Sequence, residues 1–226
     1  MISVVIPTLN ASNTLARAIE SVNDGELVAE IIVADGGSTD DTLSVAAGLR
    51  AVVVTSEPGR GQQLAAGAAA ARSSWLLFLH ADSVLAEGWL KAVTGHIDSA
   101  GVATPAGYFA LRYDDSHWKA RWLERIVAWR SRVVGLPYGD QGLLISREFY
   151  DHLGGYKLIP IMEDVDIMRR IGRRRVAALP AAIETSARRY RRAGYGLRAA
   201  WNLFCLGLYF CRVPPRLIAR IYGRHA

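Results

Sequence analysis

Short apolar runs alternate with helical patterns through the first eighty residues of this 226-residue chain. Four of the runs have the length and branched composition of buried strands, and they lie at residues 2–6, 30–34, 52–54 and 75–79. Between them, apolar residues recur at helical spacing. Strands that alternate with helices in this way predict a parallel, Rossmann-like α/β sheet with right-handed crossovers.

The pattern changes near residue 105. Residues 107–113 alternate as a half-buried, antiparallel strand would, and residues 142–146 predict a further strand. The fold class is therefore α/β, with a mixed, mainly parallel sheet flanked by helices. We expect one domain over residues 1–180 and a basic, aromatic helical extension over residues 181–226.

An aromatic stripe follows one face of the helix predicted between His117 and Val133. Trp118, Trp122 and Trp129 recur at helical spacing, with Lys and Arg on the other faces. The simplest interpretation is packing against the rest of the protein. The alternative is a platform for a sugar or a lipid.

The net charge of +6 comes from arginines that crowd the chain after about residue 112. This asymmetry suggests an anionic partner such as phosphates, nucleic acid or a lipid headgroup surface. The opening residues indicate a strand rather than a signal peptide, and no apolar run reaches the ~20 residues that span a bilayer. We expect a cytoplasmic protein, soluble or peripheral at the inner face of the membrane, with Cys205 and Cys211 both reduced.

Carboxylates stand where predicted strands end. Asp35 follows the second strand and Asp82 follows the fourth, and ligands of open α/β sheets bind beyond these ends. A further acidic cluster, Glu163 to Asp166, opens a predicted helix. The alternative for all of them is structural, because Asp caps helices and acids in a first helical turn are favoured by the dipole.

Four segments, taken in order and spacing, resemble the motif series of family 2 glycosyltransferases over roughly residues 1–180. They are Val4–Asn10, Ile32–Asp40, Phe78–Asp82 and Glu163–Asp164. Two more, Pro137–Gly142 and Thr185–Tyr190, are similar to a small bacterial subgroup of stand-alone enzymes. The resemblance implies a GT-A fold and transfer of a sugar from a nucleoside diphosphate donor, with UDP favoured.

The resemblance also implies a donor site. Pro7, Thr8 and Asn10 would line the nucleoside pocket, and Asp35 would accept a hydrogen bond from the uracil imide. The other residues that the resemblance places near the nucleotide are Arg60, Gly61, Gln62, His80 and Ala81. Arg60 supplies a fork of donors for phosphate, and its alternative is a solvated loop cation.

Asp82 matches the last acid of the family's Asp-X-Asp metal motif, which implies a divalent cation bridging this carboxylate and the diphosphate. His80 stands where the first acid would be. Since Mn²⁺ accepts imidazole more readily than Mg²⁺, we expect Mn²⁺ to serve at least as well as Mg²⁺. Contact with the ribose, or a cap on the strand, is the alternative for His80.

Asp164 aligns with the general base that deprotonates the acceptor hydroxyl in an inverting displacement, and Glu163 would orient the acceptor. Asp166 is the alternative base. Asp140 and Gln141 are expected at the acceptor side, or in a purely structural turn.

The C-terminal extension offers two further interpretations. Arg188 and Arg189 would close over the diphosphate or meet anionic lipid. The segment Trp201–Phe210 fits an interfacial helix, or one that packs on the core or forms a dimer.

The predicted activity is therefore a hexosyl-type transfer to a lipid or small secondary metabolite, with no nucleic acid partner expected and the oligomeric state open. A sugar nucleotidyltransferase is disfavoured because no Gly-rich, Lys-containing loop follows the first strand. A non-catalytic basic module for membrane or RNA is disfavoured because Asp35, Asp82 and Asp164 would repel a phosphate backbone without a metal.

Overall fold

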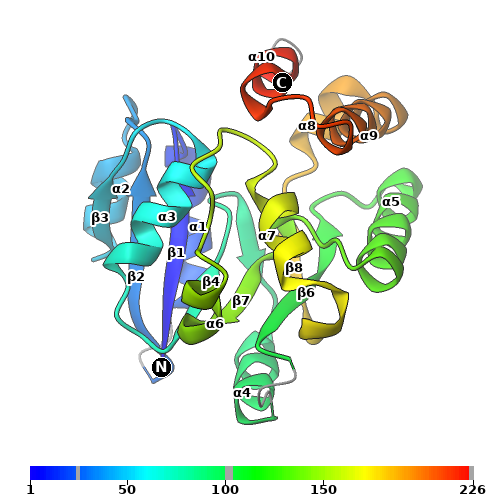
Figure 1. Cartoon of the computed structure of the whole chain (residues 1–226). Helices are drawn as coiled ribbons and strands as arrows, with labels where there is room; N and C mark the ends of the chain where they lie inside the picture. The colour runs from blue at the N-terminus through cyan, green and yellow to red at the C-terminus, as the bar shows by residue number, and fades with distance from the viewer. Residues whose placement is uncertain (24–25, 100–103, 224–226) are drawn as a thin grey trace.

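A single mixed sheet runs through the computed structural model, which describes residues 1–23, 26–99 and 104–223. Within those residues the sheet has eight strands in the order β3-β2-β1-β4-β7-β6-β8-β5, with helices on both faces (Figure 1). The fold-class prediction of a mixed α/β sheet flanked by helices is confirmed.

The N-terminal half of the sheet is parallel. It consists of β1 (Ile2–Thr8), β2 (Val28–Asp35), β3 (Val52–Thr55) and β4 (Trp75–Phe78). Strand β1 pairs with β2 and β4, and β2 also pairs with β3. Their crossovers are helices α1 (Ser12–Val22), α2 (Thr42–Gly48) and α3 (Arg60–Ala70). Helix α1 buries the apolar face that its spacing predicts. The parallel strands end at one edge, which is where the predicted carboxylates follow them.

The second half mixes directions. Strand β7 (Leu143–Ser146) is antiparallel to β4, and β6 (Ala106–Tyr113) is antiparallel to β7. Strand β8 (Val176–Thr185) then runs parallel to β6, and β5 (Ser83–Leu85) pairs antiparallel with β8. The sequence pattern did not predict β5 or β8. The expected domain boundary at residue 180 falls inside β8, so the helical extension begins after Thr185.

The remaining helices surround this half of the sheet. They are α4 (Trp89–Ser99), α5 (Trp118–Trp129), α6 (Arg147–His152), α7 (Glu163–Ile171), α8 (Arg188–Ala193), α9 (Tyr195–Phe210) and α10 (Pro215–Gly223). Short turns η1 (Arg130–Val134), η2 (Gly139–Gln141) and η3 (Arg173–Arg175) join them. Helices α8, α9 and α10 lie over the edge where the parallel strands end (Figure 1). Cys205 and Cys211 are both free thiols.

The aromatic stripe of α5 does not pack against the chain. Trp118, Trp122 and Trp129 are 67%, 58% and 60% exposed, whereas Leu123 and Val127 are buried on the opposite face. The packing interpretation of the stripe is therefore wrong, because smaller side chains suffice to seat α5 on the sheet. None of the helices in the described ranges has the length and apolar character that crossing a bilayer requires.

Candidate active site

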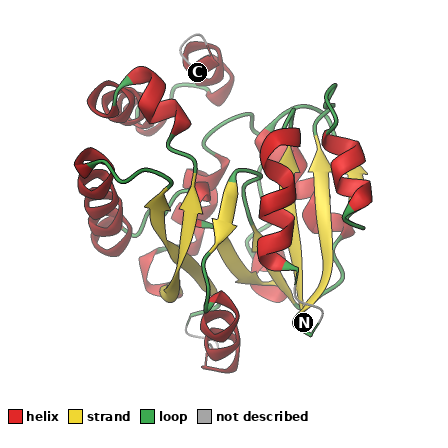
Figure 2. Cartoon of the chain, turned by 180° about the vertical axis from the view of Figure 1, so that it is seen from behind, coloured by secondary structure: helices red, strands yellow, loops and turns green. Residues whose placement is uncertain are grey.

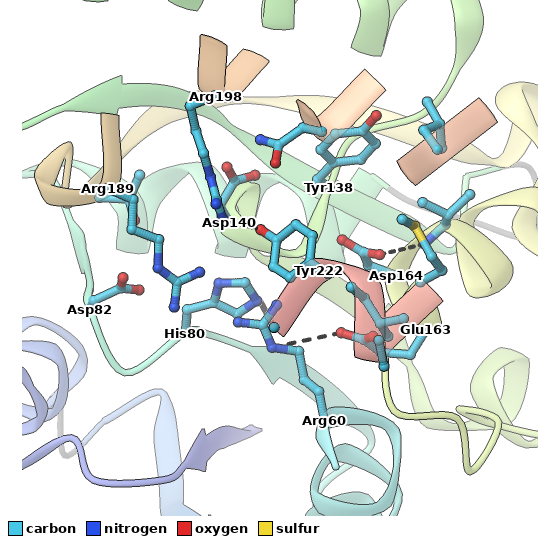
Figure 3. A pocket seen from close by; sticks show the side chains of 18 of the residues that line it. Arg60, His80, Asp82, Tyr138, Asp140, Glu163, Asp164, Arg189, Arg198 and Tyr222 are labelled. Carbon is cyan, nitrogen blue, oxygen red and sulfur yellow. Dashed lines mark hydrogen bonds and ion pairs between the residues drawn. The ribbon is translucent and has the colours of Figure 1, made fainter. Parts of the chain in front are cut away.

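A cavity of about 540 Å³ opens between the edge of the sheet and the C-terminal helices. Its lining combines residues from the ends of β4, β6 and β8 with the start of α7 and with α8, α9 and α10. Charged side chains point into it from several of these elements (Figure 3). Seven residues of the sequence-predicted site line it, namely Arg60, His80, Asp82, Asp140, Glu163, Asp164 and Arg189.

Arg60 and Glu163 meet on one wall of the cavity. Arg60 is the first residue of α3, and its Nε lies 3.7 Å from Oε1 of Glu163, which is 2% exposed at the first turn of α7. Burial, reinforced by the charge of Asp164 and opposed by that of Arg60, raises the pKa of Glu163 to about 8. Glu163 therefore holds its proton at neutral pH, while the Arg60 side chain is 42% exposed and lines the cavity from the start of α3.

His80 follows β4 and stands between two arginines. Burial and the positive charges of Arg60 and Arg189 lower the pKa of His80 well below its ordinary value. The imidazole is therefore neutral at physiological pH, which is the state in which histidine ligates metals. Its Nε2 faces Gly139 so closely that a Cβ on that glycine would lie 2.6 Å away.

Asp164 is positioned by the same glycine. Its Oδ2 accepts a hydrogen bond of 2.9 Å from the backbone N–H of Gly139, and its Oδ1 accepts one from the N–H of Val165. The carboxylate also sits in the first turn of α7, where the helix dipole favours negative charge. Asp164 thus presents a held carboxylate to the cavity, as a general base requires.

Asp166, the alternative base, is committed elsewhere. Its carboxylate pairs with Lys157 at 2.6 Å and with Arg170 at 2.7 Å, and it does not line the cavity. Neither of these partners lines the cavity. Of the two aspartates, the geometry favours Asp164 as the reactive carboxylate.

Asp140, which the sequence places at the acceptor side, lines the cavity. Burial, reinforced by the charges of Asp164 and Asp82 and opposed by that of Arg130, raises the pKa of Asp140 to about 6. Its Oδ1 is buried with no hydrogen-bond partner among the described residues. A buried acceptor aimed into a cavity is available for a hydroxyl of a ligand.

Gln141 has a structural role instead. It is buried, and its side-chain oxygen accepts hydrogen bonds from the Ser131 hydroxyl and the Arg130 guanidinium. Its amide donates to the carbonyl of Phe109. Gln141 does not line the cavity, so its expected place beside the acceptor is corrected to a brace under the segment that carries Asp140.

The predicted nucleoside residues gather at a neighbouring turn. Asp35 is buried, and its carboxylate accepts hydrogen bonds from the Thr8 hydroxyl, the Gly37 N–H, and both the N–H and hydroxyl of Ser38. Although burial opposes ionisation, these bonds lower the pKa of Asp35. Ser38 is thereby bound to Asp35 through both its N–H and its hydroxyl.

The other end of this turn is fixed by Asn10. Its side-chain oxygen accepts from the N–H of Thr39, and its own N–H donates to Ser38. The turn places Pro7, Thr8 and Asn10 beside Asp35, at the ends of β1 and β2. Leu9, within the same segment, lines the cavity, whereas Pro7, Thr8 and Asn10 do not.

Gly61 needs to be a glycine because another part of the protein's backbone packs closely against it. A Cβ on Gly61 would lie 2.2 Å from the carbonyl oxygen of Lys157, and its N–H donates to the carbonyl of Ile159. The close approach is therefore to the loop before α7. Gly61, Gln62, Ala81 and Arg188 lie outside the cavity lining.

The C-terminal helices supply a wall that the motifs did not indicate. It includes Arg198 and Asn202 from α9 and Tyr222 from α10. Arg198 is buried, with its guanidinium 4.7 Å from the centre of the Tyr222 ring, and it donates a hydrogen bond to the hydroxyl of that tyrosine. The other unpredicted lining residues with polar side chains are Tyr113, Tyr138, Thr185, Ser186 and Tyr190.

A family profile described as Glycosyl transferase family 2 matches residues 3–154, about two thirds of the chain. The chain belongs to this family. The match covers the parallel half of the sheet, Asp35, Asp82 and the segment with Asp140. The family 2 assignment predicted from the motif series is confirmed.

Relatives of known name share part of this family 2 chain. A glucosyl-3-phosphoglycerate synthase of Mycolicibacterium paratuberculosis is 41% identical over 95 residues, covering 37% of this chain and 29% of that protein. A PGL/p-HBAD biosynthesis glycosyltransferase of Mycobacterium bovis is 36% identical over 103 residues, covering 38% and 37%. The matches thus span about a third of the length of these relatives.

Solved structures resemble most of the fold. Glucosyl-3-phosphoglycerate synthase of Mycobacterium tuberculosis, crystallised with Mn²⁺ and UDP-glucose, superposes with a TM-score of 0.59 at 25% identity, over 82% of this chain and 69% of that one. S. aureus TarS superposes with a TM-score of 0.63 at 16% identity, over 83% and 61%. The GT-A character expected for the sheet is confirmed.

The donor set of this family 2 chain suits a cation that shares its ligands with a substrate. Among the described residues no cluster of three or more His, Cys, Asp or Glu side chains could enclose an ion. Asp82 and the neutral His80, the residues that the motif resemblance marks, both line the cavity. One or two protein ligands completed by phosphate oxygens and water is the usual arrangement for Mg²⁺ in phosphate chemistry.

Proposed function

We propose that this chain transfers a sugar from a UDP-sugar to a hydroxyl group of an acceptor, with inversion at the anomeric carbon and with a divalent cation, Mn²⁺ or Mg²⁺, bound at Asp82. The observation that carries the proposal is the convergence of Arg60, Asp82 and Asp164 on one cavity at the end of a parallel sheet. Membership of family 2 and the UDP-glucose complex of the M. tuberculosis enzyme support the donor class.

The chain's own groups suit each part of such a transfer. Arg60 and Arg189, on opposite sides of His80, would present two positive charges to a diphosphate (Figure 3). The bound cation would supply further charge neutralisation as the nucleotide departs. Since His80 is neutral, Asp82 brings the negative charge of the motif to the cation.

Asp164 is the proposed base. Its carboxylate takes the proton of the acceptor hydroxyl, whose oxygen bonds to the anomeric carbon as the bond from that carbon to the diphosphate oxygen breaks. The Gly139 N–H holds one carboxylate oxygen at 2.9 Å, which fixes the direction of the other. Glu163, whose pKa is raised to about 8, is protonated at neutral pH and so does not compete for the acceptor proton.

The base-binding role of Asp35 is retained in this proposal with a condition. Its oxygens already accept four hydrogen bonds within the turn, so a uracil imide would have to share an oxygen with one of these donors. The same turn aligns Pro7, Thr8 and Asn10 along the edge where the nucleoside would lie. Gly61 and Gln62 would then act on the nucleotide through the position of Arg60.

The first test is a thermal-melt panel of the purified protein with UDP, GDP, CDP, TDP and ADP, each with Mn²⁺, Mg²⁺ or EDTA. A ligand at a hundred times its dissociation constant stabilises the native state by roughly 2.7 kcal/mol, which a melt detects readily. We expect a metal-dependent shift with UDP that Asp82→Ala abolishes. The absence of a shift with every nucleotide would instead favour a non-catalytic binding module.

The stereochemical part is tested on the product. With UDP-glucose and an acceptor that the enzyme accepts, the proton coupling at the anomeric carbon distinguishes inversion from retention. Inversion agrees with a single displacement assisted by Asp164. Retention would contradict the proposed mechanism while leaving the donor class in place.

A further inference from the structure

Helix α5 and turn η1 carry an apolar ridge on the outer surface of the protein. The ridge consists of Trp118, Trp122, Ile126, Trp129 and Val133, all exposed and spaced three or four residues apart. We call these five residues the tryptophan ridge. A contiguous exposed apolar stripe of this kind marks a surface that binds a protein partner or a membrane.

The charges beside the ridge are of one sign. Lys119, Arg125 and Arg132 are exposed between the ridge positions. Glu124, the sole acid of residues 118–134, is turned toward Arg121, which it contacts at 2.9 Å. A second copy docked on the same face would bring like charges together, whereas an anionic surface would complement them.

Helix α9 widens this surface. It begins beside the start of α5, where the ring of Tyr195 stacks on that of His117 with centroids 6.3 Å apart. Both views of the molecule show α5 and α9 side by side at the same edge (Figures 1 and 2). Leu197, Leu203 and Phe204 of α9 are exposed. The two helices therefore present apolar side chains from one end of the sheet.

The inner faces of the same two helices support the part of the cavity wall that carries Asp140, the residue proposed to contact the acceptor. The Arg130 guanidinium, in the turn that continues α5, lies 3.4 Å from the centre of the Tyr138 ring, and the Ser131 hydroxyl donates to Gln141. Helix α9 lines the cavity with Asn202 and Leu206. A membrane or protein that covers the ridge would therefore lie next to this wall of the cavity.

We propose that the tryptophan ridge docks this protein on an anionic lipid bilayer, and that the acceptor is an amphiphile resident in that bilayer. Tryptophan rings favour the boundary between headgroups and acyl chains, and flanking Lys and Arg are attracted to anionic headgroups. In this mode of docking, helix α5 lies in the plane of the membrane interface and does not cross the bilayer. The acceptor part rests on the proposed transferase function, and the docking part does not.

The test is binding of the purified protein to vesicles of phosphatidylcholine alone or mixed with phosphatidylglycerol. We expect binding to the mixed vesicles, with a blue shift of the fluorescence, because three of the six tryptophans belong to the ridge. The triple variant Trp118→Ser, Trp122→Ser, Trp129→Ser should bind at least about tenfold more weakly, since it removes most of the apolar area that would be buried.

Two further variants separate apolar from electrostatic contributions. Replacing Lys119, Arg125 and Arg132 by Gln should weaken binding to the mixed vesicles by about fivefold per charge. The matched control, Leu43→Ser with Val52→Thr and Val53→Thr, changes exposed apolar residues of α2 and β3 at the opposite end of the sheet and should bind like the unaltered protein.

Two results would overturn the docking proposal. One is no binding to either vesicle, with a ridge-dependent dimer in sedimentation velocity then identifying a second copy as the partner. The other is undiminished binding of the triple tryptophan variant. The melt with UDP and Mn²⁺, run on the same samples, keeps the two proposals apart. Vesicle binding without a UDP shift would leave docking in place and contradict the transferase, whereas the reverse would contradict docking alone.

Discussion

The backbone N–H of Gly139 donates a hydrogen bond of 2.9 Å to Oδ2 of Asp164. Nε2 of His80 packs against the same glycine, in the space that a Cβ would otherwise occupy. One residue thus spaces the proposed base and the first residue of the metal motif. The pairing links η2, α7 and the end of β4 through a position that has no side chain.

Gly139→Ala tests this spacing. A Cβ would lie 2.6 Å from Nε2 of His80, so the imidazole must move, and Asp164 would lose its alignment with it. We expect at least about a tenfold loss of turnover, from a strain of about 1–3 kcal/mol distributed over the site. The measurement is kcat with the melting temperature recorded in parallel.

Gly95→Ala is the matched control. Gly95 lies within α4, and a Cβ there meets no atom within 4 Å. That alanine should leave turnover unchanged and stabilise the protein by about 0.5–1 kcal/mol. Equal turnover for both alanine variants would contradict the spacing role of Gly139.

Glu163→Gln tests the buried proton. The pKa of Glu163 is raised from an ordinary value of 4.5 to about 8, so between these pH values the folded state binds a proton that the unfolded state has lost. The contribution of this group to stability is therefore present below about pH 4.5 and declines as pH rises to about 8. The Gln variant should show a flatter fall of melting temperature over this window.

The comparison is made as a difference between the two proteins at each pH, because other groups titrate over the same range. His80, for example, has a lowered pKa and opposes the trend by favouring the folded state as pH rises. Parallel curves for the variant and the unaltered protein would show that Glu163 is ionised in the native state.

The parallel half of the fold and its carboxylates were predictable because their signals are local. Asp35 and Asp82 follow buried strands, and the helices between the strands have a clear apolar period. Strand β8 lacks such a signal. Its Pro180 lies where the register with β6 shifts, and proline is disfavoured inside a strand except at such an irregularity.

The division of labour within motifs was not predictable in the same way. Asp140 and Gln141 are adjacent, yet Asp140 lines the cavity whereas Gln141 forms buried hydrogen bonds with Phe109 and Ser131. Long-range contacts decide this, as they do for the wall formed by Arg198. The tryptophans of α5 show the converse case, because a helical period specifies a face without specifying what covers it.

Asp164→Asn and Asp166→Asn form a matched pair on one helix. Asp164 lines the cavity, so its variant should lose at least about a hundredfold in turnover, the usual worth of a general base, and keep its melting temperature. Asp166 pairs with Lys157 and Arg170, so its variant should lose about 1–3 kcal/mol of stability. Turnover and chemical denaturation of both proteins are the measurements, and an exchange of the two outcomes would make Asp166 the base.

Asp140→Asn and Gln141→Leu separate acceptor contact from bracing. Because burial raises the pKa of Asp140 to about 6 from an ordinary value of 3.8, the charged form destabilises the folded state once pH exceeds that window. At pH 8 the Asn variant should be at least as stable as the unaltered protein, with KM for the acceptor raised several-fold.

Gln141→Leu should instead lose about 1–3 kcal/mol, because the carbonyl of Phe109 is left without its donor. Denaturation at pH 8 and acceptor KM decide the matter, and a stability loss in Asp140→Asn would indicate that this carboxylate is structural.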